Sequence, residues 1–177
     1  MGDPMPDAFE TAYAFLRQWE GGDSKPRPGD PNPTSRGITQ AAWDGYATRN
    51  HARLVPVYDL TEDEVAGFYR WLWDEAEAAL LPDGAAFAYF DSVVNMGQGQ
   101  AVKLLQRAMG IGADGVIGPK TRMAMGSVTD ERALCIRLTG LRVRFYRDLA
   151  ARVPDKARFL GGWLNRVSAL QKALGVA

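Results

Sequence analysis

Glu20 is the first residue whose type and position suit acid–base chemistry. Apolar residues before it recur at helical spacing and Gly21-Gly22 follow it, so we expect it at the C-terminal end of a helix. The partial negative charge of that helix end, and Trp19 in an apolar cleft, would both raise the pKa of its carboxyl. A carboxylic acid that stays protonated near neutral pH can protonate the leaving oxygen of a glycosidic bond. On position alone, an ordinary exposed helix-end residue is the simpler interpretation.

Asp30 and Thr34 follow in a proline-rich stretch and could support such an acid. A second carboxylate across a cleft can stabilise an oxocarbenium-like transition state or orient a water molecule. A hydroxyl group beside it can hold that water. The alternatives are a turn-forming aspartate before Pro31 and a threonine hydroxyl that bonds to nearby backbone.

Other chemistries have little support in this sequence. The single histidine, His51, stands in a polar stretch, and we interpret it as a solvated loop residue. The single cysteine, Cys135, cannot form an internal disulfide and is expected to fill apolar space on a helix. We therefore expect neither a metal ion nor another cofactor.

Most of the chain shows the apolar spacing of helices, and no strand-like alternation persists. A first helix is expected from about Phe9 to Trp19. Residues 23–37 hold four prolines and two glycines, which predicts a loop or a short irregular hairpin. Further helices are expected around residues 39–46, 61–76, 87–94, 101–108, 129–152 and 156–174.

Local signals fix some boundaries of these helices. Thr39 is a predicted N-cap, and Thr61 with Glu64 forms a predicted capping box. Residues 110–119 are expected to be a turn-rich connector. Helical spacing assigns four residues to the core: Phe87, Phe90, Leu104 and Leu105. Trp163 fits the core better than a platform for sugar.

Charge is distributed unevenly over the 177 residues, which suit one domain or two small lobes. Residues 1–82 carry 14 acidic and 7 basic side chains, a net charge of −7, and residues 83–177 carry the reverse, +7. A basic half can hold a polyanion, or the two halves can complement each other electrostatically. Both interpretations stay open.

The N-terminal motifs are Trp19-Glu20-Gly21-Gly22, then Asp30-Pro31, then Thr34-Ser35-Arg36-Gly37-Ile38-Thr39. In this order they resemble the signature of glycoside hydrolase family 108, which comprises phage-type endolysins and secretion-associated muramidases. Asp23 departs from the signature, which has an aromatic residue there, and Asn32 stands where the family has Gly-Gly. The second half resembles the predicted peptidoglycan-binding domain usually fused to this family. The matching stretches are residues 90–97, 101–106, 114–121 and 161–166.

The resemblance implies a mainly α, lysozyme-like, two-lobed helical fold with a Pro/Gly-rich loop or short β-hairpin after the first helix. It implies hydrolysis of the β-1,4 bond between N-acetylmuramic acid and N-acetylglucosamine, with Glu20 as general acid and with Asp30 and Thr34 as the supporting pair. The segment Asn95-Met96-Gly97 is similar to one that lines the sugar cleft of phage lysozymes, so Asn95 is expected to contact an N-acetyl group. By the same analogy, inversion of configuration is favoured.

We expect residues 1–82 to form the catalytic lobe and residues 83–177 a helical peptidoglycan-binding lobe packed into the same globule. The implied partner is bacterial peptidoglycan, and nucleic acid is not expected. A phage or prophage lysis setting, or a secretion-coupled one, would add a holin or export machinery. The exposed candidates for wall contact are Lys103, Arg107, Lys120 and Arg122.

The N-terminus lacks a basic region followed by an apolar one, so we expect synthesis in the cytoplasm without a signal peptide, and action on the wall in the periplasm after release. No apolar run reaches ~18 residues, so stable membrane insertion is not expected. Two alternative functions stay open: a non-catalytic peptidoglycan-binding protein, and a lytic transglycosylase, which would use one glutamate but release an anhydro sugar.

Overall fold

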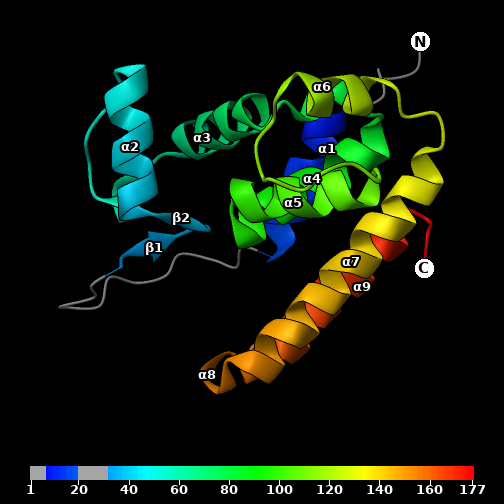
Figure 1. Ribbon diagram of the computed structural model, residues 1–177. Coiled ribbons are helices and arrows are strands. Elements are labelled where there is room, and N and C mark those ends of the chain that lie inside the picture. The colour runs from blue at the N-terminus through cyan, green and yellow to red at the C-terminus, as the bar shows by residue number, and fades with distance from the viewer. Residues whose placement is uncertain (1–6, 20–31) are drawn as a thin grey trace, which may run out of the picture. The chain divides into compact units, whose positions relative to one another are not determined.

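The computed structural model describes residues 7–19 and 32–177, and helices dominate them (Figure 1). The sheet in this described part is a single hairpin of two-residue strands. The mainly α class predicted from the sequence is confirmed. Among the residues described, no helix combines the length and apolar character needed to cross a membrane.

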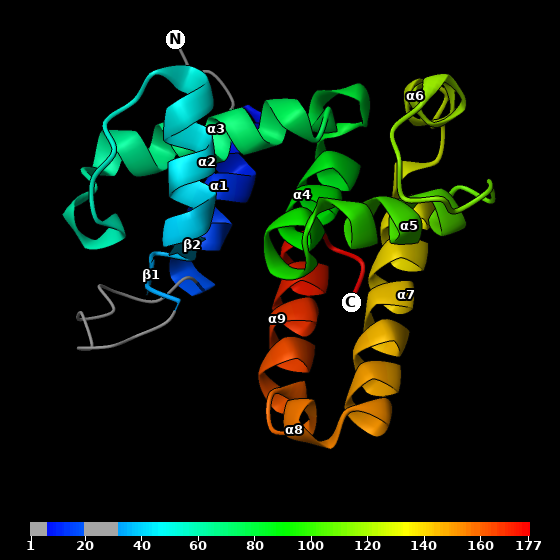
Figure 2. The same cartoon turned by 60° about the vertical axis from the view of Figure 1, so that its left-hand side comes forward.

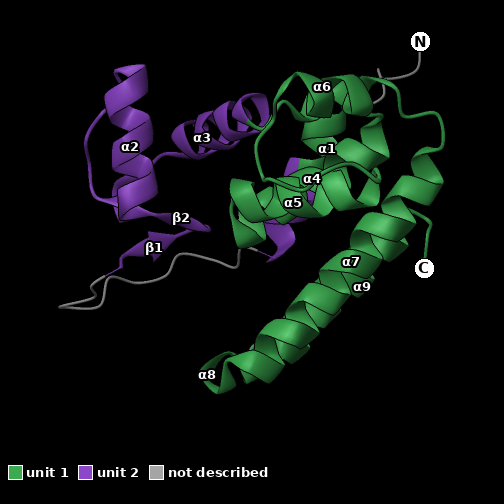
Figure 3. Cartoon of the chain, in the orientation of Figure 1, with its two compact units in different colours: residues 1–12, 76–177 green, residues 13–75 purple. Residues whose placement is uncertain are grey.

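The chain separates into two compact units (Figure 3). Unit 1 comprises residues 1–12 and 76–177, and unit 2 comprises residues 13–75. Helix α1 (Ala8–Trp19) contributes its first residues to unit 1 and the rest to unit 2. The functional division predicted between residues 82 and 83 stays a prediction.

Unit 2 combines the second part of α1 with a hairpin and two further helices. Its elements are β1 (Thr34–Ser35), β2 (Ile38–Thr39), α2 (Gln40–Asn50), the 3-10 turn η1 (Val57–Asp59) and α3 (Glu62–Glu75). The predicted N-cap of α2 is confirmed, because Thr39 Oγ1 accepts a hydrogen bond from Ala42 N at 3.2 Å. The predicted capping box of α3 is confirmed as well. Thr61 Oγ1 accepts from Glu64 N at 3.2 Å, and Glu64 Oε2 accepts from Thr61 N at 2.8 Å.

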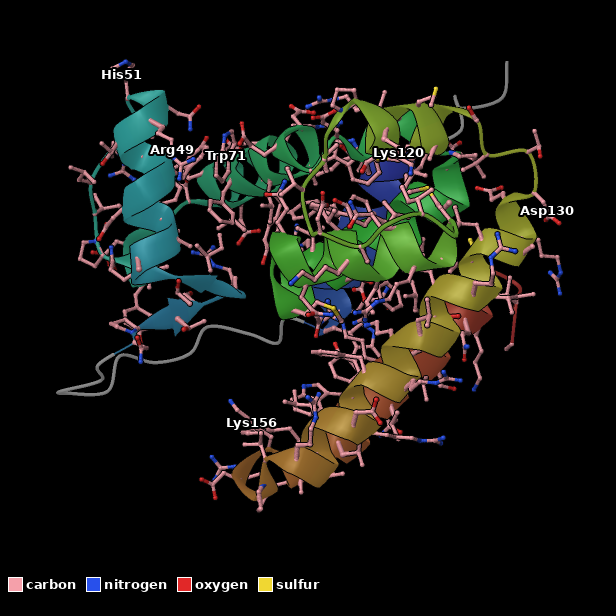
Figure 4. All side chains as sticks on the ribbon, viewed as in Figure 1. Arg49, His51, Trp71, Lys120, Asp130 and Lys156 are labelled. Carbon is pink, nitrogen blue, oxygen red and sulfur yellow. The ribbon has the colours of Figure 1, made fainter. Side chains whose placement is uncertain are left out.

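Aromatic side chains join α2 to α3 in the core of unit 2. Trp43 of α2 is fully buried. Tyr46 of α2 meets Phe68 of α3 edge-on, with ring centroids 5.5 Å apart, and lies 5.2 Å from Trp71. The Arg49 guanidinium lies over the Trp71 ring, 5.4 Å from its centroid (Figure 4). Such aromatic and cation–π contacts fix the two helices as one layer.

Helix α4 (Asp83–Met96) is the centre of unit 1. Residues 85–93 of this helix are all buried, so protein covers it on every face. It contacts the 3-10 turn η2 (Ala78–Leu80) and the helices α5 (Gln98–Ala108) and α7 (Glu131–Arg152). The four predicted core residues, Phe87, Phe90, Leu104 and Leu105, are buried as expected.

Three further helices complete unit 1: α6 (Pro119–Gly126), α8 (Pro154–Ala157) and α9 (Leu160–Ala173). Figure 2 shows α7 and α9 side by side, with the short α8 at the turn between them. Helix α6 was not predicted. It starts at a proline in the first helical position, which presets the backbone, but buries only Thr121 and Met125 and so lacks a full apolar stripe. The single helix predicted over 156–174 is instead divided into α8 and α9.

Candidate functional site

A tight hairpin turn holds Thr34 in place. Strands β1 and β2 pair antiparallel with Thr34 opposite Thr39, and Arg36-Gly37 form the two-residue loop between them. Both loop residues have positive φ angles, 48° and 79°, as a type I′ turn requires. Glycine adopts this conformation freely, whereas an arginine there must be held by its surroundings.

The Arg36 side chain and carbonyl supply that support. Its Nη2 donates to Leu60 O at 2.6 Å and its Nη1 to Glu62 Oε1 at 2.8 Å. Its carbonyl oxygen accepts from the Tyr69 hydroxyl at 2.8 Å. Glu62 also pairs with Arg17 of α1 at 3.0 Å. The hairpin is therefore fixed to both α1 and α3 within unit 2.

Thr34 is half-buried, and its hydroxyl donates to the backbone carbonyl of Asn32 at 3.1 Å. This bond matches the alternative interpretation of Thr34 as a residue that bonds to nearby backbone. It leaves the lone pairs of the hydroxyl oxygen as acceptors. Helix α1 ends at Trp19, the residue before Glu20. Glu20 and Asp30 themselves lie outside the described residues.

Asn95 lies half-buried in the last turn of α4, in unit 1. With its amide oxygen turned toward α9, it accepts from Arg166 Nε at 2.8 Å and Nη2 at 2.9 Å. Gly97, with φ of 79°, ends the helix two residues later. Arg166 thus holds the side chain that is expected to contact sugar. Arg166 lies in the matching stretch 161–166, but no role was predicted for it.

Arg166 is in turn bound to a buried carboxylate, Asp91. Asp91 Oδ1 accepts from Arg166 Nη2 at 2.7 Å, and Asp91 Oδ2 accepts from Arg142 Nη1 at 2.5 Å. Asp91 is 0%, Arg142 1% and Arg166 6% exposed. One carboxylate between two buried guanidinium groups is an exceptional cluster, because burying charge is costly unless it is paired. Tyr146 also joins it, accepting from Arg142 Nε at 3.2 Å.

The two residues set aside in the sequence fit their expected roles. His51 caps the end of α2 in a left-handed conformation and is exposed (Figure 4). Cys135 is buried in α7, and burial raises the pKa of its thiol to about 11. Trp163 is half-buried and stacks on Tyr146, with centroids 4.8 Å apart.

The motif at residues 114–121 holds a loop together around the buried amide of Gln106. Gln106 Nε2 donates to Asp114 Oδ1 at 2.7 Å and to Thr121 Oγ1 at 3.0 Å, and its Oε1 accepts from Gly115 N at 2.9 Å. A hydrogen bond from Val116 N, and then that from Gln106, lowers the pKa of Asp114. The polar residues and glycine of this motif therefore have a structural role, because they fix the loop that connects α5 to α6.

The four basic residues expected to contact the wall differ in their surroundings. Arg122 pairs with Glu77 through two bonds, of 2.6 Å and 2.5 Å, so its charge is already neutralised. Lys120 is exposed on α6 (Figure 4), Arg107 is exposed on α5, and Lys103 is half-buried.

Two family matches together cover most of this sequence. Residues 13–97 match the family described as glycosyl hydrolase 108, and residues 100–168 match the predicted peptidoglycan domain. These two matches confirm the resemblance that the sequence motifs indicated. The protein is a glycoside hydrolase, its partner is peptidoglycan, and it acts on the cell wall.

The solved structure of Brucella abortus SagA is similar to this chain over nearly its whole length. The two chains are 28% identical, the match covers 95% of this chain and 94% of SagA, and the TM-score is 0.73. The mainly α, lysozyme-like fold expected from the resemblance is confirmed. None of the curated proteins matches this chain.

The border between the two matches runs through unit 1, between α4 and α5. We call residues 13–97 the hydrolase segment and residues 100–168 the peptidoglycan segment. Asp91 and Asn95 belong to the hydrolase segment, and Arg142 and Arg166 to the peptidoglycan segment. Glu131 of the peptidoglycan segment also accepts from Gly84 N at the start of α4. The match to glycosyl hydrolase 108 thus includes a helix whose buried Asp91 pairs with two arginines of the other segment.

Proposed function

We propose that this protein hydrolyses the β-1,4 bond between N-acetylmuramic acid and N-acetylglucosamine in peptidoglycan, with Glu20 as general acid. The observation that carries the proposal is that residues 13–97, which include Glu20, match glycosyl hydrolase 108, and the sequence predicts Glu20 at the C-terminal end of a helix. A carboxyl at the C-terminal end of a helix faces partial negative charge, which favours its protonated form. That form is the one a leaving glycosidic oxygen needs.

In this proposal Asp30 and Thr34 serve the water side of the reaction. Asp30 supplies the second carboxylate, which orients the attacking water or stabilises positive charge on the sugar ring. Thr34 supports it through its hydroxyl oxygen. The hydroxyl proton is directed to Asn32 O, which leaves the oxygen to accept a hydrogen from water. The braced hairpin keeps that oxygen in one place, which catalysis requires.

Asn95 has the proposed role of binding an N-acetyl group of the substrate. Its amide oxygen accepts from Arg166, so its NH₂ group is the part oriented for a sugar carbonyl. A group held by a charged, buried partner is pre-organised, because little freedom is lost when substrate binds. The Asp91–Arg166 pair therefore acts as a positioning device for Asn95.

We further propose that residues 1–82 are the catalytic lobe and residues 83–177 the peptidoglycan-binding lobe, sharing the core around α4. Two contacts within unit 1 support a shared core, because Glu77 pairs with Arg122 and the ring centroids of Phe9 and Phe90 lie 6.3 Å apart. The proposed setting is phage or prophage lysis, or secretion-coupled wall remodelling, with a holin or an export machinery for release.

The products of digestion test the proposed bond and reaction. Purified peptidoglycan is incubated with the protein, and the fragments are analysed by mass spectrometry before and after borohydride reduction. Hydrolysis at the proposed bond gives fragments with a reducible N-acetylmuramic acid end. Fragments lighter by one water, with an anhydro end that borohydride leaves unchanged, would identify a lytic transglycosylase. Intact glycan that still sediments with the protein would identify a wall-binding protein.

A further inference from the structure

A groove of about 370 Å³ lies between α5 and α7, and its lining includes Arg107, one of the residues expected to contact the wall. Arg107 of α5 and the α7 residues Arg137 and Arg144 line it, together with Ile136 and Gly140 of α7. All of these residues lie in the peptidoglycan segment and in unit 1. Arg137, Gly140 and Arg144 are three to four residues apart, so they share one helix face.

The three arginines have no acidic partner within ion-pair distance among the described residues. Elsewhere Arg36, Arg122, Arg142 and Arg166 are bound to carboxylates. Arg137 is fixed at the groove by its Nε, which donates to Ala108 O at 2.8 Å at the end of α5. Like charges gathered in one groove without counter-charges attract an anion.

Gly140 supplies an independent sign that the groove takes a ligand. It stands in the middle of the 22-residue helix α7, where glycine weakens a helix relative to alanine. Packing does not explain it, because no heavy atom of the described residues lies within 4 Å of a Cβ built there. A glycine in this position leaves the groove floor open to the helix backbone, which permits close approach of a ligand.

Ile136 gives the groove an apolar side. Its side chain is 47% exposed, so it offers apolar surface to a ligand in the groove. A ligand suited to both features carries carboxylates for the guanidinium groups and small apolar groups for the isoleucine. Guanidinium binds carboxylate through two parallel hydrogen bonds, and so recognises it by shape as well as charge.

We propose that this groove, which we call the stem groove, binds the carboxylate-bearing stem peptide of peptidoglycan. Stem peptides combine free carboxylates with alanine methyl groups, and they hang from the glycan that the hydrolase segment cuts. The inference rests on the proposed action on peptidoglycan. It assigns Arg107 and Arg144, with Arg137 between them, to recognition of the peptide instead of the sugar.

Sedimentation binding to purified wall sacculi tests the proposal, with all variants made on Glu20→Gln so that the walls stay uncut. The groove variants are Arg107→Glu/Arg144→Glu and Gly140→Trp. The matched controls are Arg147→Glu/Arg158→Glu, which changes net charge equally at exposed positions, and Gly162→Trp, a second helical glycine whose surroundings are open. Sacculi stripped of stem peptides by an amidase form the second substrate. Circular dichroism establishes that each variant is folded, and the arginine pair keeps the test valid where the tryptophan disturbs the fold.

We expect each groove variant to bind intact sacculi at least tenfold more weakly, a change of about 1.4 kcal/mol per factor of ten, while the controls stay within about twofold. Stripped sacculi should bind the parent and the groove variants equally weakly. Groove variants that bind as the parent does would overturn the proposal, as would equal losses in the charge controls or full binding to stripped sacculi. Cutting of walls by the Glu20 protein is measured separately, so the proposed function can fail while the stem groove holds, and the reverse.

Discussion

At the scale of residues, hydrogen bonds connect Asn95, the proposed substrate-binding residue, to the interior of the protein. Asn95 bonds to Arg166, and Arg166 bonds to the fully buried Asp91. Arg142 binds the other oxygen of the same carboxylate, and its second side-chain partner is the Tyr146 hydroxyl instead of Asn95. The two arginines therefore differ in that only Arg166 bonds to Asn95, and mutation can test this difference.

Asn95 and Arg166 should act as a unit in catalysis. We expect Asn95→Ala and Arg166→Lys each to lower kcat/KM about tenfold, with the larger share in KM, and the double variant to lose little more than either alone. Arg142→Lys also disturbs Asp91 but not Asn95, so it serves as the control and should combine additively with Asn95→Ala. Steady-state kinetics on soluble glycan fragments gives the coupling. Additive losses for Asn95 and Arg166 would show that the arginine does not position the amide.

Residue type and spacing in the sequence could predict only part of the candidate site. Glu20, Asp30 and Thr34 were selectable because of their chemistry and spacing. Asp91 carried a usable signal, since it is a lone charge inside a run of apolar helix residues. Its partners could not be found this way, because Arg142 and Arg166 lie 51 and 75 residues further along the chain. Only the packing of α4, α7 and α9 brings them together.

At the scale of elements, predictions held where the signal was local. Thr39 and the Thr61–Glu64 pair were identified because capping acts over three residues. Helix α6 escaped prediction because its stability comes from contacts with distant residues, such as the Gln106 bond to Thr121 and the Arg122 pair with Glu77. The sequence predicted only a loop or a short irregular hairpin, without its turn. The positive φ angle of Arg36 depends on distant partners, which are Tyr69 of α3 and the carbonyl of Leu60.

The capping box of α3 gives an expected pH dependence. A hydrogen bond from Arg53, and then one from Thr61 N, lower the pKa of Glu64 from 4.5 to about 2. Because the folded pKa is depressed, this carboxylate stabilises the fold fully above about pH 4.5, and its contribution is lost as pH falls toward 2.

Urea denaturation between pH 2 and pH 7 checks this expectation. We expect Glu64→Gln to be less stable than the parent at pH 7, with the difference shrinking as pH falls below about 4.5. Asp74→Asn, at an exposed position of the same helix, is the control for loss of one negative charge. A stability difference that stays constant down to pH 2 would contradict the assignment to this carboxylate.

At the scale of the whole molecule, the two family segments share one core within unit 1. The buried Asp91 cluster and the bond from Gly84 N to Glu131 both join them. The pair of Glu77 with Arg122 also links the acidic and basic halves of the sequence, while the arginines of the stem groove remain available for an anion. Neither polyanion binding by the basic half nor electrostatic complementarity of the two halves therefore accounts for the whole charge asymmetry.

Removing the charge of Asp91 should destabilise both segments together. We expect Asp91→Asn to lower the free energy of unfolding by about 3–5 kcal/mol, because two buried guanidinium groups lose their counter-charge. Urea denaturation measures the loss, and hydrogen exchange of α4 and α9 shows whether both segments open. Asp83→Asn, exposed at the start of the same helix, should cost about 1 kcal/mol or less. Equal effects at the two positions would contradict a structural role for the cluster.

The most direct test of the account is the clearing of purified bacterial walls, stripped of outer membrane, by the parent protein and by Glu20→Gln. Turbidity is followed at equal protein concentration, and circular dichroism establishes that the variant is folded. We predict that the parent clears the walls and that Glu20→Gln leaves them turbid, because an amide cannot donate the proton that the leaving oxygen needs. Walls cleared equally by both proteins would contradict Glu20 as the acid, and walls cleared by neither, with both proteins sedimenting on them, would contradict hydrolysis itself.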